Sequence, residues 1–148
     1  MTQERKAIRA AAVAALKAHP VISVGATVYG DRHIAILAGR VPFVAVTTPS
    51  EEVEIWTQAP RTSARELTLV VECTVEGSQG LADAVDDLAT FAEEAILADT
   101  TLGGTSSDLT LTGVQCSFEV DGDTAKGSAE LSFSVTYVTE DQPVTDTL

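Results

Sequence analysis

The chain has 148 residues, the length of one ordinary domain, and a chain of this length buries roughly 70% of the surface that it exposes when unfolded. Apolar residues make up 45% of the sequence and charged residues 21%, a balance typical of a globular protein that excludes disorder, collagen and a long coiled coil. Residues 1–65 hold eight basic and five acidic side chains, whereas residues 66–148 hold one basic and 17 acidic side chains. An acidic half of this kind excludes general binding to the nucleic-acid backbone, because that affinity comes from Lys and Arg.

Residues 2–18 are predicted to form an amphipathic helix that starts at the N-cap Thr2 and stops before Pro20. Charged residues interrupt every apolar run in this segment, so it does not resemble a signal peptide, and no run of about 18 apolar residues indicates a membrane span. We expect a protein that is made and kept in the cytosol. The apolar stripe of the helix is Ile8, Ala12, Ala15 and Leu16.

The next segment is predicted to be β-rich up to residue 76. A short strand-like piece at 26–29 precedes a loop with Asp31, Arg32 and His33. Residues 41–47 suit a strand whose Pro42 places it at an edge or a strand start, and residues 51–57, bracketed by Pro49 and Pro60, suit a short separate hairpin. Residues 66–76 alternate almost without fault, with Leu67, Leu69, Val71, Cys73 and Val75 on one face.

After residue 80 the apolar period becomes helical, opposite an acidic face that includes Asp86, Asp87 and Glu93. Ser78 is the predicted cap, and the two glycines after Leu102 are the predicted stop. Two long strands follow, with a bulge predicted at Gly113, where the apolar phase slips by one residue, and a turn at 121–123. We therefore predict an α+β fold: a mostly antiparallel sheet with two helices packed on one face, plus a β-hairpin. Residues 1–139 form a single domain and residues 140–148 a flexible C-terminal tail.

The chemistry-bearing residues do not combine into a site that the sequence can identify. Cys73 and Cys116 both fall on the apolar phase of strands, so we expect two buried thiols rather than metal ligands. Adjacent carboxylates diverge rather than converge on one atom, and His19 and His33 lack a triad context. The Gly-rich segment at 102–105 follows a helix and precedes a strand, which is the reverse of a phosphate loop. We predict no catalytic residue, no metal and no cofactor.

Assembly is the better explanation of the surface residues. A basic first half and an acidic second half allow copies to bind head to tail, a contact that closes into a ring if the rotation permits. Trp56 is the only tryptophan of the sequence, and the alternation places it opposite Val53 and Ile55. It suits either an interface anchor or a small packing cluster under the neighbouring loop. The predicted subunit or tube contacts, drawn from loops and an edge hairpin, are Arg32, Arg40, Phe43 and Trp56.

The chain resembles the tail terminator proteins of long-tailed bacteriophages, including the minor tail protein U type, in the order and spacing of six segments. These are RKAIRAAAVAALKA, VYGDRHIAI, RVPFVAVTTPSEEVEIW, ELTLVVECTVEG, LADAVDDLATFAEEAILAD and AELSFSVTYVTED. The resemblance covers most of the chain and carries no catalytic motif. It implies a non-enzymatic virion protein, assembled in the host cytoplasm, that forms a typically six-fold ring at the head-proximal end of the tail. Its implied partners are other copies of itself, the tail tube protein, the head-completion or connector protein and the tape-measure protein. DNA would pass through the channel without specific binding, past an acidic wall that repels it.

Two other classes of function remain open at this point. Within the structural class, the chain could be another head–tail joining, neck or tail tube protein of similar fold. In a different class, it could be a small-molecule-binding or enzymatic α+β domain, which would need a deep pocket lined by convergent polar groups. A nucleic-acid module using the basic first half is a third reading, and we expect no salt-dependent DNA binding.

Overall fold

The computed structural model describes residues 3–32, 34–35, 41–58, 61–77, 79–122 and 124–140. Within these residues the order of helices and strands confirms the predicted α+β class. The elements are α1 (Gln3–Ala18), α2 (Ile22–Gly25), β1 (Thr27–Tyr29), β2 (Phe43–Gln58), β3 (Arg61–Gly77), α4 (Leu81–Leu97), β4 (Asp108–Asp121) and β5 (Thr124–Glu140).

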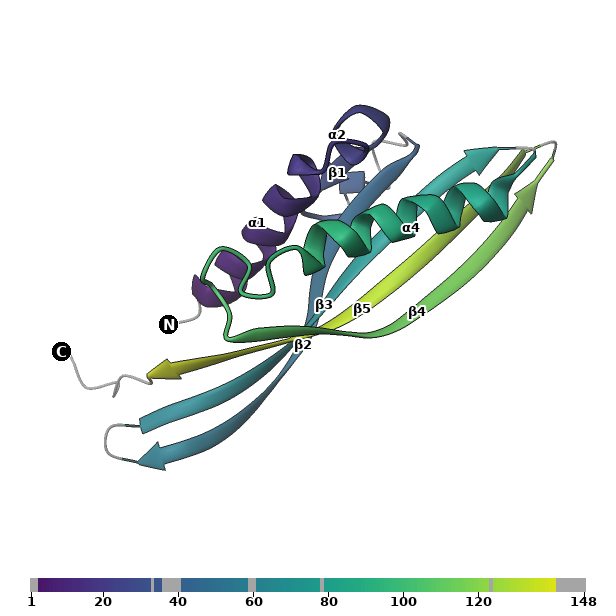
Figure 1. Cartoon of the computed structure of the whole chain (residues 1–148). Helices are drawn as coiled ribbons and strands as arrows, with labels where there is room; N and C mark the ends of the chain where they lie inside the picture. The colour runs from purple at the N-terminus through teal and green to yellow at the C-terminus, as the bar shows by residue number, and fades with distance from the viewer. Residues whose placement is uncertain are drawn as a thin grey trace.

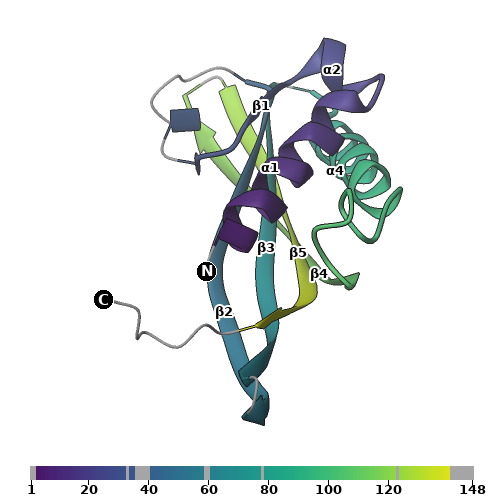
Figure 2. The same cartoon turned by 90° about the vertical axis from the view of Figure 1, so that its left-hand side faces the viewer.

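The strands form one sheet in the order β1-β2-β3-β5-β4, in which β1 is parallel to β2 and the other neighbours are antiparallel. The helices α1 and α4 both lie on one face of the sheet, as predicted (Figure 1). α1 packs on the β1 and β2 side and α4 packs on β3 and β5. The far ends of β2 and β3 extend beyond both helices (Figures 1 and 2).

The main core lies between the helices and the sheet. The alternation in residues 66–76 is confirmed, because the odd-numbered side chains of β3 from Leu67 to Cys73 are fully buried. β2, β5, α1 and α4 complete this core with Val44, Val46, Leu131, Phe133, Val135, Ile8, Ala12, Leu16, Val85, Ala92 and Ile96. Burial of these side chains, rather than intrinsic helix propensity, stabilises the short helices.

The separate hairpin predicted at residues 51–57 is wrong, because β2 runs through Pro49 as one strand. The register slips between Thr47 and Ser50, and this irregularity removes Pro49 from the hydrogen-bond ladder that it cannot join. The hairpin is therefore the long β2–β3 pair. Pro42, in contrast, directly precedes the strand start, as predicted.

The bulge predicted near Gly113 is confirmed by the register slip between Leu111 and Gly113. The expected burial of Cys116 is wrong: Cys73 is buried, whereas Cys116 is exposed. Cys116 pairs with the buried Ala129 and so lies on the helix side of the sheet. Because β4 is the edge strand and α4 packs on β3 and β5, the correct apolar phase does not produce burial here.

The limits of α4 also differ from those predicted. The N-cap position is Gly80, in a left-handed conformation, and Ser78 lies outside the described residues, as do Thr2 and His33. The helix ends at Leu97, before the glycines, because Asp99 accepts hydrogen bonds from the backbone N–H groups of Thr101 and Gly103 and folds the chain into a turn. Glu140, which was predicted to begin the tail at 140–148, is the last residue of β5, and residues 141–148 lie outside the described residues.

Candidate assembly surfaces

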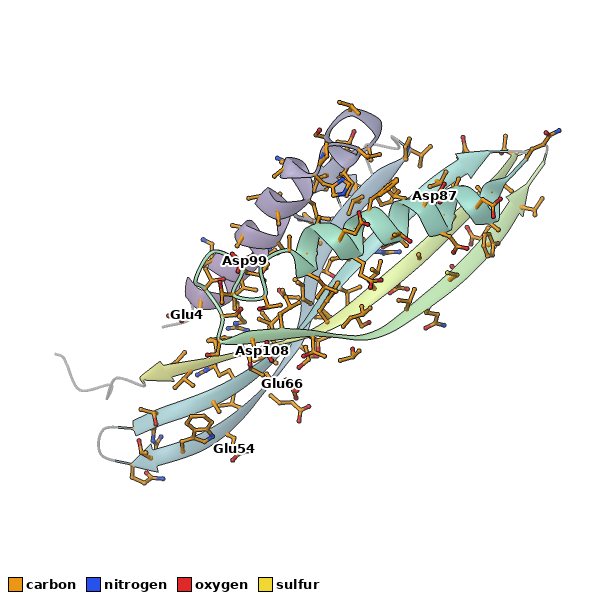
Figure 3. All side chains as sticks on the ribbon, viewed as in Figure 1. Glu4, Glu54, Glu66, Asp87, Asp99 and Asp108 are labelled. Atoms are coloured by element: carbon orange, nitrogen blue, oxygen red, sulfur yellow. The ribbon has the colours of Figure 1, made fainter. Side chains whose placement is uncertain are left out.

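The side of the sheet away from α1 and α4, called the open face here, is strongly acidic. Strand register places the even-numbered residues of β3 and β5 on this side, opposite the buried odd-numbered residues. Glu54 and Glu66 point away from the helices in Figure 3. The carboxylates that share this face are Glu52, Glu54, Glu66, Glu72, Glu76, Asp108, Glu119 and Glu130. Between them lie hydroxyl side chains, among them Thr68, Thr110, Ser117, Ser128, Ser132, Ser134 and Thr136.

Two basic side chains meet this acidic face. Lys126 lies between Glu76 and Glu119 on the neighbouring strands. Arg32 donates from Nε to Glu72 across the sheet surface, and the two groups form an ion pair. Since the remaining described carboxylates outnumber these two cations, the face has a negative potential. A hollow of about 270 Å³ on this face is lined by both cations together with Glu72, Glu119 and Glu130.

Beyond the helices, residues 52–58 of β2 and 61–66 of β3 form an extension that we call the arm. On its helix side Val53 and Ile55 are each about half exposed, because neither helix reaches them. On its open face Trp56 is 59% exposed and occupies the register slip between Ile55 and Thr57. A broad groove of about 620 Å³ runs past this tryptophan, lined also by Ala64, Glu66, Thr136 and Val138. The arm thus presents apolar side chains on both faces, an arrangement typical of protein contact surfaces.

A buried polar cluster fixes the base of the arm. The side chain of Glu51 is only 6% exposed, and its carboxylate accepts hydrogen bonds from Arg65 Nη1 at 2.8 Å and from the Tyr137 hydroxyl. Arg5 of α1 approaches the same carboxylate at 3.8 Å. Burial, and donation to Glu51, raise the pKa of the Tyr137 hydroxyl. The cluster joins β2, β3, β5 and the first turn of α1, so the arm is held at a defined angle to the body.

The predicted contact residues divide into three groups. Trp56 is on the surface, and Arg32 is paired with Glu72 of the central strand β3 on the open face. Phe43 is 6% exposed and packs edge-on against Tyr29 in a small core with Ala35 and Ala45, so it supports the surface instead of forming it. Arg40 lies outside the described residues.

Sequence reasoning missed the open face and the Glu51 cluster. The acidic side chains of the face were visible as the polar phase of the strands at 66–76 and 128–136, but only the strand order joins them into one surface. Glu51 and Tyr137 are 86 residues apart, and no local pattern pairs them.

The described part of the chain contains no group of three or more His, Cys, Asp or Glu side chains arranged to hold a metal ion. His19 Nε2 lies 3.3 Å from Glu94 Oε1, and the imidazole ring packs in a tilted arrangement against the ring of Phe91. No described helix is both long enough and apolar enough to span a membrane.

No protein-family model and no curated protein matches the chain. Among solved structures, a chain from the virion of a native gene transfer agent particle is similar over 92% of this chain and 99% of that one, with 13% sequence identity and a TM-score of 0.47. A likeness of this degree does not determine function.

Proposed function

We propose that this protein is a non-enzymatic structural component of a phage-like virion, located at the head-proximal end of the tail. In this proposal copies of the chain form a ring that caps the tail tube, stops its polymerisation and presents a surface to the head-completion protein. The proposal combines the sequence resemblance to tail terminators with the surfaces described above.

The observation that carries the proposal is the acidic open face. A twisted, mostly antiparallel sheet that carries its helices on one side can close into a ring with its other side inward. The carboxylates and hydroxyls of that side would then line the channel, and the helices would form the outer layer. Like charge would keep passing DNA from adhering to the wall.

The wall can be tested by reversing its charge. Glu66, Glu72 and Glu130 lie centrally on the open face, and their joint replacement by Lys changes the charge by about six units per chain. We expect the unaltered protein not to retard double-stranded DNA at low ionic strength, and the triple variant to retard it in a salt-dependent manner. Replacement of Asp83, Asp87 and Glu94, which are exposed on α4, by Lys is the matched control, since it adds equal charge to the helix layer. Equal retardation by both variants would refute the assignment of the open face to the channel.

The arm is the proposed contact with the tail tube. It extends along the strand direction beyond the helix layer (Figure 1). Trp56 and the carboxylates of the arm line one groove together with Val138 of the neighbouring strand β5. An aromatic side chain surrounded by polar groups is typical of an interface anchor.

The function is tested by adding the purified protein to polymerising tail tube protein. We expect tubes to stop growing when the protein binds their ends, and the Trp56→Ala variant to need a concentration at least about tenfold higher for the same effect. Tubes that continue to grow in its presence would refute the terminator role. Incorporation of the protein along the tube would indicate a tube subunit instead.

A further inference from the structure

The edge strand β4 carries an apolar stripe on its helix side, which we define as Val114, Cys116, Phe118 and Val120. Val114 and Phe118 are about half exposed, and Val120 is 80% exposed. The strand is 14 residues long and contains neither Pro nor Lys, the residues that usually protect an open edge. A long apolar edge of this kind promotes uncontrolled pairing unless a partner covers it.

An apolar patch of similar character lies at the opposite edge of the same sheet. Val24, in α2, is 87% exposed and Val21, directly before it, is 44% exposed. α2 leads directly into β1, which is the edge strand on that side.

The two patches lie at the same level along the strands. The register runs across the whole sheet from Thr27 in β1 through Phe43, Thr74 and Ser128 to Ser117 in β4. Since α2 precedes Thr27, it lies towards the same end of the sheet as Phe118 and Val120, which follow Ser117. When two contact surfaces lie at the same height on the subunit, each added copy is rotated about the assembly axis with little translation along it. Repetition of such a contact closes a ring instead of building a filament.

The charges that flank the patches are opposite in sign. On α1, Lys6, Val13 and Lys17 lie on one flank of the helix. This flank is directed towards the β1 edge, because a methyl group of Val13 lies 3.5 Å from the point where a Cβ atom added to Gly30 would be. On α4, the helical period places Asp86 and Glu93 on the flank away from α1. The end of α1 lies beside the second half of α4, where His19 contacts Phe91 and Glu94, so Lys17 corresponds in height to Glu93.

We propose that the β4 stripe binds a second copy of this chain, whose α2 covers Val114, Phe118 and Val120 while its α1 lies beside the acidic flank of α4. This contact is heterologous and would be the subunit interface of the ring. It therefore rests on the proposed function, which supplies the ring. The complementary charges set the orientation of the two copies, and the apolar patches supply the buried area.

Cysteine crosslinking tests the interface, because Cys116 already lies in the stripe. In the Val24→Cys variant a short bismaleimide should join the introduced thiol of one copy to Cys116 of the next and yield a ladder of products that ends at the closed ring. Cys73 does not interfere, since burial raises the pKa of its thiol to about 12. Glu54→Cys, exposed on the arm at the other end of the sheet and remote from both patches, is the matched control and should yield no ladder.

Charge exchange provides a second measurement on variants that keep the apolar core intact. Glu93→Lys and Lys17→Asp should each weaken self-association by at least about tenfold, and the double variant should restore it. The mass in solution is measured over a wide concentration range for each variant.

The outcomes separate this interface from the proposed function. A ring detected by mass without the ladder overturns the interface and leaves the ring. A crosslinked ring that does not stop tube growth supports the interface and overturns the terminator role. A protein that stays monomeric and uncrosslinked over the whole concentration range overturns the interface.

Discussion

Gly127 of β5 occupies a position where α4 rests directly on the sheet, and its replacement by Ala tests how tightly these layers are packed. A Cβ atom added there would lie 2.5 Å from Val85 Cγ2 and 3.0 Å from a ring carbon of Phe118. Carbon atoms in contact prefer about 3.5–4.0 Å, so the start of α4 or the strand must move by roughly 1 Å. Val85 is fully buried and β-branched, and its side chain cannot rotate away easily.

The magnitude follows from two opposing effects. Overpacking of this kind destabilises the folded state by about 2 kcal/mol. Replacement of Gly by Ala also lowers the conformational entropy of the unfolded chain, which offsets about 0.5 kcal/mol of that loss. We therefore expect Gly127→Ala to lower the free energy of unfolding by about 1.5 kcal/mol and the Tm by about 3–6 °C. Urea denaturation and calorimetry measure both quantities.

A double-mutant cycle identifies the cause. Val85→Ala removes the methyl group nearest to the new Cβ, so Gly127→Ala should cost at least about 1 kcal/mol less in that background, where only the contact with the Phe118 ring remains. Gly77→Ala is the control in the same sheet, because no atom lies within 4 Å of its Cβ position. If Gly127→Ala is neutral in the unaltered protein, or if Val85→Ala does not relieve it, the close packing described here is wrong.

Two further predictions concern the arm and the buried thiol. Glu51→Ala leaves Arg65 and the Tyr137 hydroxyl without their carboxylate, so we expect the free energy of unfolding, measured by urea denaturation, to fall by about 3 kcal/mol. The control Glu52→Ala, at an exposed position, should change it by less than about 0.5 kcal/mol. Equal effects of the two variants would contradict a structural role for the cluster. The pKa of Cys73 rises from 9.0 to about 12 because the thiol is buried, and folding therefore favours its protonated form. Its contribution to stability is fully present below pH 9 and is lost as the pH rises towards about 12. Cys73→Ala should flatten this alkaline decline, and Cys116→Ala should leave it unchanged; a decline unaffected by Cys73→Ala would assign it to other groups.

The regular parts of the fold could be predicted because their patterns are local. The alternation of Leu67 to Cys73 and the helical period through Val85 and Ile96 correspond directly to burial in the structure. The bulge near Gly113 was visible as a phase slip, since one extra residue moves every later side chain to the other face.

Exposure could not be predicted in the same way, because it depends on which layer lies above a strand. Cys73 and Cys116 have the same local pattern, yet α4 covers only the first, since β3 is central and β4 is the edge. The prediction of a short hairpin failed for a related reason: Pro49 is locally typical of a break, but a register slip keeps it within a single strand.

The sequence by itself determined the fold class, the apolar phase of each strand and the separation of charge into a basic and an acidic half, because these follow from composition and periodicity. The tertiary structure alone decided where those charges lie. The strand order β1-β2-β3-β5-β4 collects glutamates from four strands on the face away from the helices and sets the basic α1 and the acidic α4 towards opposite edges. Long-range strand pairing, which no local pattern encodes, is the physical reason that both surfaces exist.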